Sequence, residues 1–488
     1  MSTNPHEGRG DVSDRARIHP ARVLVPLAVG VAIALSPAPQ GLSPQAWRYF
    51  ALFASVIAGM IAEPIPAGAI GLVGVVTAGA LHMVRATPAE STTWALSGFA
   101  NGTVWLVFAA YMFSLGYSRT GLGRRIALKL ISVMGHRTLG LGYAIMLADV
   151  VLAPVTASST ARSGATVYPV VRQIPELYGS RPHDASARQI GAYLLYTAMA
   201  ASIVTSSLFV TGMAPNVLAL TLAHSVAGVT ITWTDWFVGF APVGVLLLAV
   251  LPLLLYRIYP PGIKNAPEAP IWARAQLGDM GPMSRAELTL MVLVLTALAL
   301  WIGGGRVIDP TMAAMLIVAL MVVLGVVTWE QVLGNAEAWN VLVWFATVVT
   351  LAGGLAETGV VRWMAEAIAP ALSGLGSYAT IACLVGAFFV IHYLFASITA
   401  HTATLYAMFL AVAVRTNTAS PKAWALLLGY SLGLMGILTS YASGQNPIYA
   451  GSGYISRRAF WLLGLSLGII FFGAYMVIIV PWLRWLGV

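Results

Sequence analysis

The sequence predicts an all-α polytopic membrane protein with about 11 transmembrane helices and two re-entrant helical hairpins, arranged as two inverted-topology repeats. Three observations predict this fold. Of the 488 residues, 59% are hydrophobic and only 9% are charged, whereas soluble domains carry about 25% charged residues. Two pairs of apolar runs are too short to cross a bilayer, which takes about 20 residues per helix. Short polar landmarks around these pairs recur in the same order in both halves.

The first half of the chain is predicted to cover residues 23–259. It follows a polar segment, residues 1–22, that we interpret as a cytoplasmic tail without a cleavable secretory signal. The apolar runs of this half predict spans at 23–35, 47–62, 67–84 and 103–117, a basic amphipathic surface segment at 119–137, a hairpin at 139–178, a broken helix at 190–227 and a last span at 237–259.

The second half is predicted to cover residues 286–488. A polar stretch with five prolines, residues 260–285, separates it from the first half and predicts a cytoplasmic linker. The apolar runs then predict spans at 286–302, 312–327 and 341–356, a surface segment at 360–371, a hairpin at 376–416, a broken helix at 423–455 and a closing span at 460–480.

The distribution of basic residues predicts the orientation in the membrane. With the N-terminus in the cytoplasm, 18 Lys and Arg residues fall on the cytoplasmic side, 7 fall outside, and Arg162 within a hairpin completes the 26. We therefore expect a multi-pass protein of the cell inner membrane, in contact with membrane lipid. The net charge of +9 is scattered over helix ends, which argues against nucleic acid as a partner. The two hairpins then open from opposite sides.

The first hairpin turns at a polar stretch, residues 153–164, which contains Ser158, Ser159, Thr160 and Arg162. Polar backbone is not tolerated against lipid at this depth, so the tip must line a protein-walled cavity. Arginine within a half-span is costly and should face that cavity, where its planar fork suits a carboxylate. The alternative is an ion pair between Arg162 and Asp149 that holds the hairpin together.

The second hairpin turns at residues 396–404. We align its tip as Ala400-His401-Thr402 beneath Ser158-Ser159-Thr160. His401 has no acidic neighbour in the sequence, and we expect it to bind substrate or to carry charge. The alternative is an ordinary core histidine, which is how we interpret His392 in the first arm. Paired, interrupted apolar segments in two halves are typical of a transporter binding site.

The predicted site suits an anion with two negative charges. The second arm of each hairpin, and the half-helix after each break at 211–216 and 443–447, would point its N-terminus into one cavity. Each helix start carries about half a positive charge and several free N–H donors, so four of them supply about two charges. None of these tips or breaks contains an acidic residue. The candidate substrate-binding residues are Ser158, Ser159, Thr160, Arg162, Thr211, Gly212, His401, Thr402, Ser443 and Gly444.

Other classes of protein fit the sequence poorly. The single cysteine, Cys383, excludes a disulfide framework and a cysteine metal site, and we expect neither a metal nor a cofactor. Two matches to the hydrolase elbow pattern, at 429–433 and 464–468, lie inside apolar helices rather than on a strand-to-helix turn. No loop exceeds about 25–30 residues, which leaves little room for a catalytic or sensing domain. We therefore do not expect an enzyme.

Three stretches resemble the divalent anion/sodium symporter (DASS) family, and the resemblance extends over nearly the whole chain after residue 20. They are residues 153–164, 395–402 and 439–454. The pattern is most similar to the bacterial citrate/succinate and tartrate/succinate antiporters and the plastid 2-oxoglutarate/malate translocators. The resemblance implies a homodimer of inverted repeats, in which a transport domain carries both hairpins and moves like an elevator against a scaffold domain.

Sodium-coupled members of that family carry Ser-Asn-Thr at each tip, and both asparagines are absent here. The resemblance therefore implies exchange of C4/C5 di- or tricarboxylate anions, such as tartrate, citrate, malate or 2-oxoglutarate against succinate. A sodium- or proton-coupled dicarboxylate symporter is the alternative. Arg162 and His401 would supply fixed positive charge in place of sodium, so that only the loaded carrier crosses readily.

Overall fold

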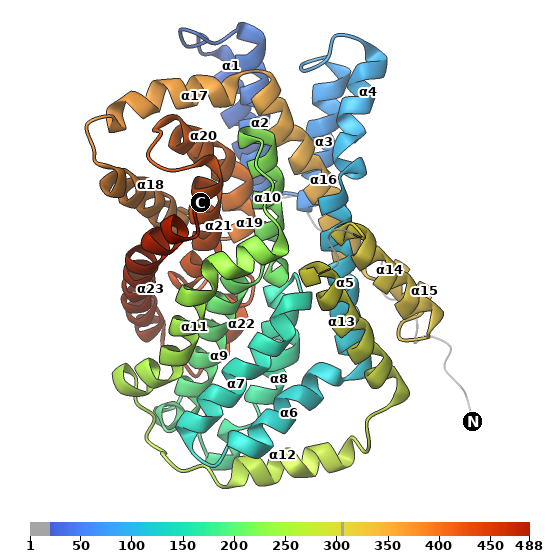
Figure 1. Ribbon diagram of the computed structural model, residues 1–488, viewed down its shortest axis with the longest axis vertical. Coiled ribbons are helices and arrows are strands. Elements are labelled where there is room, and N and C mark those ends of the chain that lie inside the picture. Colours follow the sequence, from blue (N-terminus) through green and yellow to red (C-terminus); the bar gives the residue numbers. More distant parts are fainter. Residues whose placement is uncertain (1–19, 304–306) are drawn as a thin grey trace.

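The computed structural model describes residues 20–303 and 307–488, and most of the predicted tail 1–22 lies outside these ranges. Every regular element in the described ranges is a helix (Figure 1). Among the described residues, ten helical segments are long and apolar enough to cross a membrane, and three of these are hairpin arms. Four shorter apolar helices, of 10–17 residues, accompany them. The predicted all-helical membrane fold is confirmed.

The first half follows the predicted order, with two additional short helices, Pro88–Leu96 and Glu268–Asp279, that the sequence did not predict. Its elements are α1 (Pro20–Leu35), α2 (Pro44–Ala62), α3 (Ala67–Ala80), α4 (Pro88–Leu96), η1 (Ser97–Ala100), α5 (Gly102–Thr120), α6 (Leu122–Met134), α7 (Thr138–Leu152), η2 (Ala153–Val155), η3 (Thr160–Val167), α8 (Tyr168–Val171), η4 (Pro175–Tyr178), η5 (Ala185–Arg188), α9 (Gly191–Leu208), η6 (Val210–Gly212), α10 (Ala214–Ala227), α11 (Trp233–Ile258) and α12 (Glu268–Asp279).

The second half repeats this order from α13 onward. Its elements are α13 (Arg285–Gly303), α14 (Pro310–Val323), α15 (Trp329–Leu333), α16 (Ala336–Glu357), α17 (Val360–Ile368), η7 (Ala369–Leu372), α18 (Ser377–Ile391), η8 (His392–Leu394), α19 (Ile398–His401), η9 (Thr402–Tyr406), α20 (Ala407–Arg415), α21 (Pro421–Leu434), η10 (Met435–Ile437), α22 (Asn446–Ala450) and α23 (Arg457–Trp485).

Equivalent helices of the two halves have matching lengths and opposite positions. Helices α2 and α13 both have 19 residues, α3 and α14 both have 14, and the first hairpin arms α7 and α18 both have 15. Figure 1 shows the arm helix α6 near the bottom of the molecule and its equivalent α17 near the top. The halves are therefore inverted repeats, as the sequence landmarks predict.

The arm helices, α6 and α17, each begin after a residue whose backbone conformation only glycine adopts without strain. Gly121 precedes α6 with φ of 78°, and Gly359 precedes α17 with φ of 85°. A residue with a Cβ is strained in this left-handed region. The glycines turn the chain sharply from α5 and α16 into the arms, which lead to the two hairpins.

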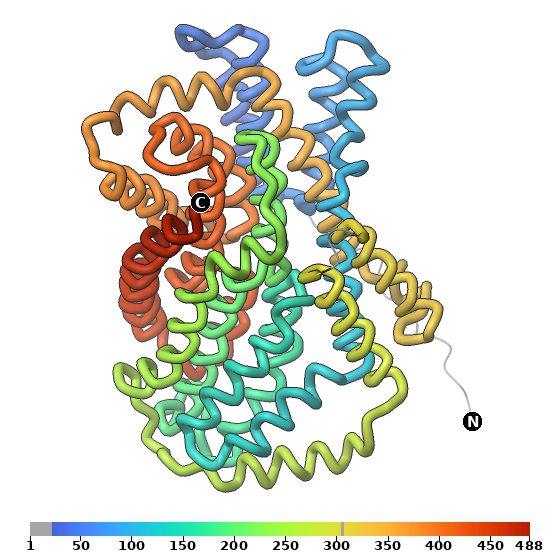
Figure 2. Tube along the Cα trace, viewed as in Figure 1, coloured from blue at the N-terminus to red at the C-terminus, as the bar shows by residue number. Residues whose placement is uncertain are grey.

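The two broken helices cross at the centre of the molecule. Every residue of α9 is buried, and its Ser207 hydroxyl donates to the Tyr430 carbonyl of α21 at 2.9 Å. The approach requires Gly433, because a Cβ there would lie 2.2 Å from Ser207 Oγ. The tube in Figure 2 shows the hairpins and α9–α11 together on one side, with α3, α5 and α13–α16 on the other. The crossing helices thus form the core to which both hairpins attach.

Three features of the predicted elements are wrong. The predicted linker 260–285 contains a 12-residue helix, α12, which packs along α6 and is too short for a span. Helices α4 and α15 are separate short elements, each begun by a capping threonine, Thr87 and Thr328. The half-helix after the second break, α22, has only five residues.

Candidate functional site

Both hairpin tips are built by the same local pattern. The first arm ends in a tight 3₁₀ turn, at Ala153–Val155 and at His392–Leu394. A serine then caps the second arm: the Ser158 hydroxyl accepts from the Ala161 N–H at 3.1 Å, and the Ser397 hydroxyl accepts from the Ala400 N–H at 3.4 Å. Each second arm then widens into a π-helical stretch, at Thr160–Val167 and Thr402–Tyr406, a feature that often marks functional sites.

The capping serines correct the predicted alignment of the tips. They place Ser158-Ser159-Thr160-Ala161-Arg162 over Ser397-Ile398-Thr399-Ala400-His401, with identical residues at three of five positions. The predicted alignment, with Ala400-His401-Thr402, is wrong by three residues, because it matched polar residues without locating the helix cap. The middle positions of the tips are Ser159 and Ile398, and Arg162 is the equivalent of His401.

The two tips meet at a cavity of about 230 Å³. Five of the ten predicted site residues line it: Ser158, Ser159, Thr160, Ser443 and Gly444. The remaining lining residues, which sequence reasoning did not assign to the site, are Tyr111, Ala157, Met213, Ala214, Pro215, Ser397, Ile398 and Thr399. The cavity therefore joins both hairpins, both helix breaks and α5.

Three helix starts face this cavity. The second arm of the first hairpin begins at Thr160, that of the second hairpin at Ile398, and α10 at Ala214, and all three residues line the cavity. The N–H groups of a first helical turn lack partners within the helix. The fourth predicted start, that of α22, belongs to a helix too short for a sizeable dipole. No acidic residue lines the cavity, so its potential favours an anion.

Arg162 points away from the cavity into the protein. Its guanidinium is buried, and Nε lies 3.2 Å from Asp149 Oδ2. The two terminal nitrogens donate to five further groups: the carbonyls of Thr156, Gly212 and Ser202 and the hydroxyls of Thr205 and Ser206. All five N–H groups of the side chain are thus engaged. The structure shows the ion pair that the sequence left as the alternative, and Asp149 compensates the arginine charge.

The other predicted residues that do not line the cavity lie just behind it. The Thr211 hydroxyl donates to the Pro154 carbonyl, and the Gly212 carbonyl accepts from Arg162 at 2.7 Å. The Thr402 hydroxyl donates to the Ile398 carbonyl of its own helix at 2.8 Å. His401 is buried against the rings of Phe388 and Phe395. These side chains shape the tips and breaks rather than face the cavity.

Asparagines hold the two breaks in the same way. Asn216 Nδ2 donates to the carbonyls of Ser206 at 2.6 Å and Phe209 at 3.0 Å. Asn446 Nδ2 donates to the carbonyls of Gly436 and Thr439, both at 2.7 Å. In both halves the acceptors lie ten and seven residues before the asparagine. The repeat thus extends to individual hydrogen bonds that stabilise the broken helices.

Three lining residues show what the sequence could and could not reveal. Ser397 and Thr399 were within reach of sequence reasoning, because the correct tip alignment gives Ser-x-Thr-Ala in both halves. Tyr111 carried no signal, because it lies within the long apolar helix α5 and reaches the site only through the packing of α5 against the hairpins.

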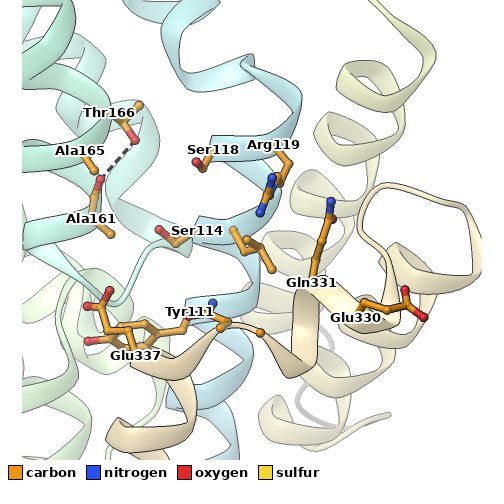
Figure 3. Close-up of a pocket in the computed structure, with 13 residues that line it drawn as sticks. Tyr111, Ser114, Ser118, Arg119, Ala161, Ala165, Thr166, Glu330, Gln331 and Glu337 are labelled. Carbon is orange, nitrogen blue, oxygen red and sulfur yellow. Dashed lines mark hydrogen bonds between the residues drawn. The ribbon is translucent and has the colours of Figure 1, made fainter. Parts of the chain in front are cut away.

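A second, wider cavity of about 480 Å³ adjoins the first at Tyr111, which lines both. It lies between the second arm of the first hairpin, α5 and the α15–α16 region, and Figure 3 shows Arg119 and Gln331 extending into the space from α5 and α15. Glu330, at the start of α15, is exposed; hydrogen bonds from its own backbone N–H and from the Thr328 hydroxyl lower the pKa of its carboxyl. The wider cavity gives the tip cavity a vestibule on the side of α6 and α12.

Comparisons with known proteins agree with this architecture. The family model of the sodium:sulfate symporter transmembrane region matches residues 18–488. The L-tartrate/succinate antiporters of Shigella sonnei (strain Ss046), Escherichia coli O157:H7 and Escherichia coli (strain K12) are each 42% identical to this chain over 479 residues, which are 96% of this chain and 98% of the relative.

A solved structure shares the fold. The crystal structure of the Alcanivorax borkumensis YdaH transporter superposes with a TM-score of 0.56 at 16% sequence identity, covering 86% of this chain and 97% of that chain. At this identity the likeness concerns the fold alone. The family match confirms the resemblance inferred from the tips and breaks, and it identifies a transporter rather than an enzyme. The chain belongs to the sodium:sulfate symporter family, that is, to the DASS family of transporters.

Proposed function

We propose that the protein is a secondary transporter that exchanges C4/C5 di- or tricarboxylates across the membrane, with the substrate held in the tip cavity. One observation carries this proposal: two hairpin tips of equivalent sequence and two helix breaks enclose one cavity that contains hydroxyls and helix starts but no acid. The relatives with 42% identity are named L-tartrate/succinate antiporters, which makes tartrate and succinate the first substrates to test.

The chemistry of the cavity accounts for selectivity towards dianions. The hydroxyls of Ser158, Thr160, Ser397 and Thr399, together with the N–H groups of three helix starts, can donate to two carboxylates at once. Three starts contribute about one and a half positive charges. This matches two carboxylates better than one. The Tyr111 phenol completes the wall on the α5 side.

The tips also favour exchange over sodium symport. The family resemblance implies asparagine in the middle of each Ser-x-Thr tip of sodium-coupled members, whereas here Ser159 and Ile398 occupy these positions. Hard cations bind oxygen ligands, and the isoleucine side chain offers none. A sodium- or proton-coupled symporter is the competing function, and net uptake driven by an ion gradient into vesicles without internal dicarboxylate separates the two.

We further propose an elevator movement in which both hairpins and the broken helices α9–α10 and α21–α22 travel against α1–α5 and α13–α16. The vestibule supports a state that opens towards α6 and α12, the side with the excess of basic residues. This side is the cytoplasm if the N-terminus is cytoplasmic. Location in the bacterial inner membrane and assembly as a homodimer belong to the same proposal, and chemical cross-linking in native membranes tests the dimer.

Counterflow in proteoliposomes tests the exchange. Uptake of labelled L-tartrate should be fast into vesicles preloaded with succinate and slow into empty vesicles, with no effect of a sodium gradient. A panel of unlabelled di- and tricarboxylates then ranks the substrates by competition. Fast sodium-driven uptake into empty vesicles would overturn exchange in favour of symport.

A matched pair of threonine variants tests the site. Thr399→Val removes a hydroxyl that lines the cavity, and loss of a hydrogen bond to a charged group costs about 1.5–3 kcal/mol, or about 10–100-fold in affinity. Thr404→Val is the control, because that hydroxyl donates to the Ala400 carbonyl on the same helix and does not line the cavity. Equal affinities in the two variants would contradict the proposed site.

A further inference from the structure

His401 occupies the position of Arg162 without the partners that Arg162 has. In the first half, Arg162 pairs with Asp149, thirteen residues earlier. In the second half, the residue thirteen positions before His401 is Phe388, and the two rings meet edge to face with centroids 4.4 Å apart. The permanent cation therefore has its own carboxylate, whereas the histidine has an aromatic ring instead.

A second histidine completes the equivalence. Arg162 donates to the Gly212 carbonyl in the first break. The equivalent carbonyl, by the register of Asn216 and Asn446, is Ala442 in the second break, and His392 Nε2 lies 3.0 Å from it. The His392 and His401 rings are 5.2 Å apart. Two histidines together thus occupy the place that one arginine fills in the other half.

This histidine pair has unused hydrogen-bonding capacity. Both side chains are fully buried, yet among the described residues His401 Nδ1, His401 Nε2 and His392 Nδ1 have no hydrogen-bond partner. Buried polar atoms are normally satisfied, so three unpartnered nitrogens in one cluster require an explanation. Imidazole nitrogens of this kind can take up a proton when a negative charge comes near.

Among the described residues, the helices packed against the pair place no buried carboxylate beside it. The charged side chains and the histidine on these helices lie near helix ends: Arg48 in the first turns of α2, Glu63 just after it, His224 on α10, Arg415 on α20 and Lys422 on α21. Helix α23, which meets α18 through Phe472, carries Arg457, Arg458 and Arg484 at its ends. Nearer the pair in sequence are Cys383, Tyr393 and Tyr406, and the Tyr441 hydroxyl donates to the Tyr393 carbonyl at 3.2 Å. Glu63, the one carboxylate among these groups, is exposed.

We propose that the His392–His401 pair is a proton-binding site that fills when a dicarboxylate binds at the tips, so that the substrate crosses together with a proton. Ser397, one helical turn before His401, lines the cavity. Burial disfavours a charged imidazole in the empty carrier, and a dianion one turn away favours it. By linkage, the proton then favours the dianion equally. This inference rests on the proposed dicarboxylate site and adds the cation that the substrate lacks.

Calorimetric titration of the purified protein with L-tartrate tests the proposal. Tartrate carboxyls have pKa values near those of other carboxylic acids, about 4, and are ionised above about pH 6, so a proton taken up goes to the protein. Measurements in two buffers of different ionisation enthalpy give the number of protons bound with each tartrate. We expect close to one proton bound with each tartrate. We also expect the tartrate affinity to rise by up to tenfold for each unit by which the pH falls. This rise should begin at the pKa of the pair in the complex and end at the lower pKa of the pair in the empty carrier.

Glutamine variants assign the proton. His401→Gln should abolish the uptake and flatten the pH dependence, and His392→Gln is the second variant if the first does not fold. His224→Gln, which changes an exposed histidine on α10, should retain both. Tartrate binding without proton uptake in the unaltered protein, or uptake that persists in the His401 and His392 variants, overturns the proton site but leaves the proposed transport function. Failure of the unaltered protein to bind any dicarboxylate overturns the proposed function itself.

Discussion

Arg162 and Asp149 form a charged pair that is fully enclosed by the first hairpin and α9. Enclosure decides its role, because a guanidinium with every donor engaged cannot also bind a substrate carboxylate. An arginine in a membrane half-span thus need not face the cavity: a carboxylate one arm earlier can compensate its charge within the protein. The sequence offered both interpretations, and only the side-chain positions separate them.

Replacement of the arginine should therefore affect stability more than affinity. Arg162→Met leaves Asp149 buried without its cation, and breaking a buried pair in this way costs about 3–5 kcal/mol. We expect a large fall in thermal stability in detergent, with the tartrate affinity of the folded fraction within a few-fold of the unaltered protein. Arg172→Met, at an exposed arginine, is the control. Unchanged stability with lost binding would show that Arg162 holds the substrate.

Gly444 sets how closely the second break approaches the first tip. A Cβ there would lie 2.3 Å from Thr160 Oγ1, so Gly444→Ala should force the Thr160 side chain to rotate in the cavity. Overpacking of this kind costs about 1–3 kcal/mol, which we expect as about 5–100-fold weaker tartrate binding. Combination with Thr160→Ser should not relieve the contact, since the hydroxyl remains, whereas combination with Thr160→Ala should recover part of the affinity.

The control for this contact is Gly353→Ala. A Cβ at Gly353 would meet nothing within 4 Å, so binding should be unchanged. If Gly444→Ala also bound tartrate normally, the break and the tip would have to be further apart during binding than they are here.

At the scale of elements, the start of the arm helix α17 depends on the backbone conformation of one residue rather than on side-chain contacts. Gly359 has φ of 85°, and a Cβ there would meet nothing within 4 Å. Any effect of a side chain at this position therefore comes from the left-handed conformation, which costs about 1–2 kcal/mol for a residue with a Cβ. In the turn between α16 and α17, Gly359 is the residue that must adopt this left-handed conformation.

Gly359→Ala should lower the free energy of unfolding by about 1–2 kcal/mol and slow the exchange of tartrate, because α17 connects the second hairpin to α16. Thermal unfolding and counterflow rates measure the two effects. Gly374→Ala, at a glycine with open space and an ordinary φ, should change neither. An equal effect of the two substitutions would mean that the turn tolerates a Cβ.

The elements themselves were largely predictable, for local reasons. Apolar runs, prolines and glycines mark the hairpins and breaks, and the glycines before α6 and α17 are the landmarks that matched in the two halves. Helices α4, α12 and α15 were missed because each is short and only partly apolar. The predicted alignment of the two tips was wrong because it depends on which serine caps the second arm. A cap is a particular hydrogen bond, and the composition of the stretch does not show which serine makes it.

At the scale of the whole molecule, the vestibule between α5, α15 and the first hairpin should be reached from one side of the membrane only. Ala165 lines it and is exposed. With Cys383 replaced by serine, Ala165→Cys should react with a membrane-impermeant maleimide in inside-out vesicles and not in right-side-out cells. Ala275→Cys on α12, also exposed, is the control for cytoplasmic labelling. Reaction of Ala165→Cys only from outside would reverse the proposed orientation.

The sequence by itself determined that this is a helical membrane protein of two inverted repeats, and it predicts a multivalent anion at their polar tips and breaks. These properties follow from composition, hydrophobic periodicity and local breaks, each of which acts over a few residues. The tertiary structure alone decided that Arg162 belongs to Asp149, that Tyr111 lines the cavity, and that His392 and His401 share the place of one arginine. Arg162 and Asp149 are 13 positions apart, His392 and the Ala442 carbonyl are 50 apart, and Tyr111 and Gly444, which line the same cavity, are 333 apart. These pairings depend on how helices pack, which no local pattern records.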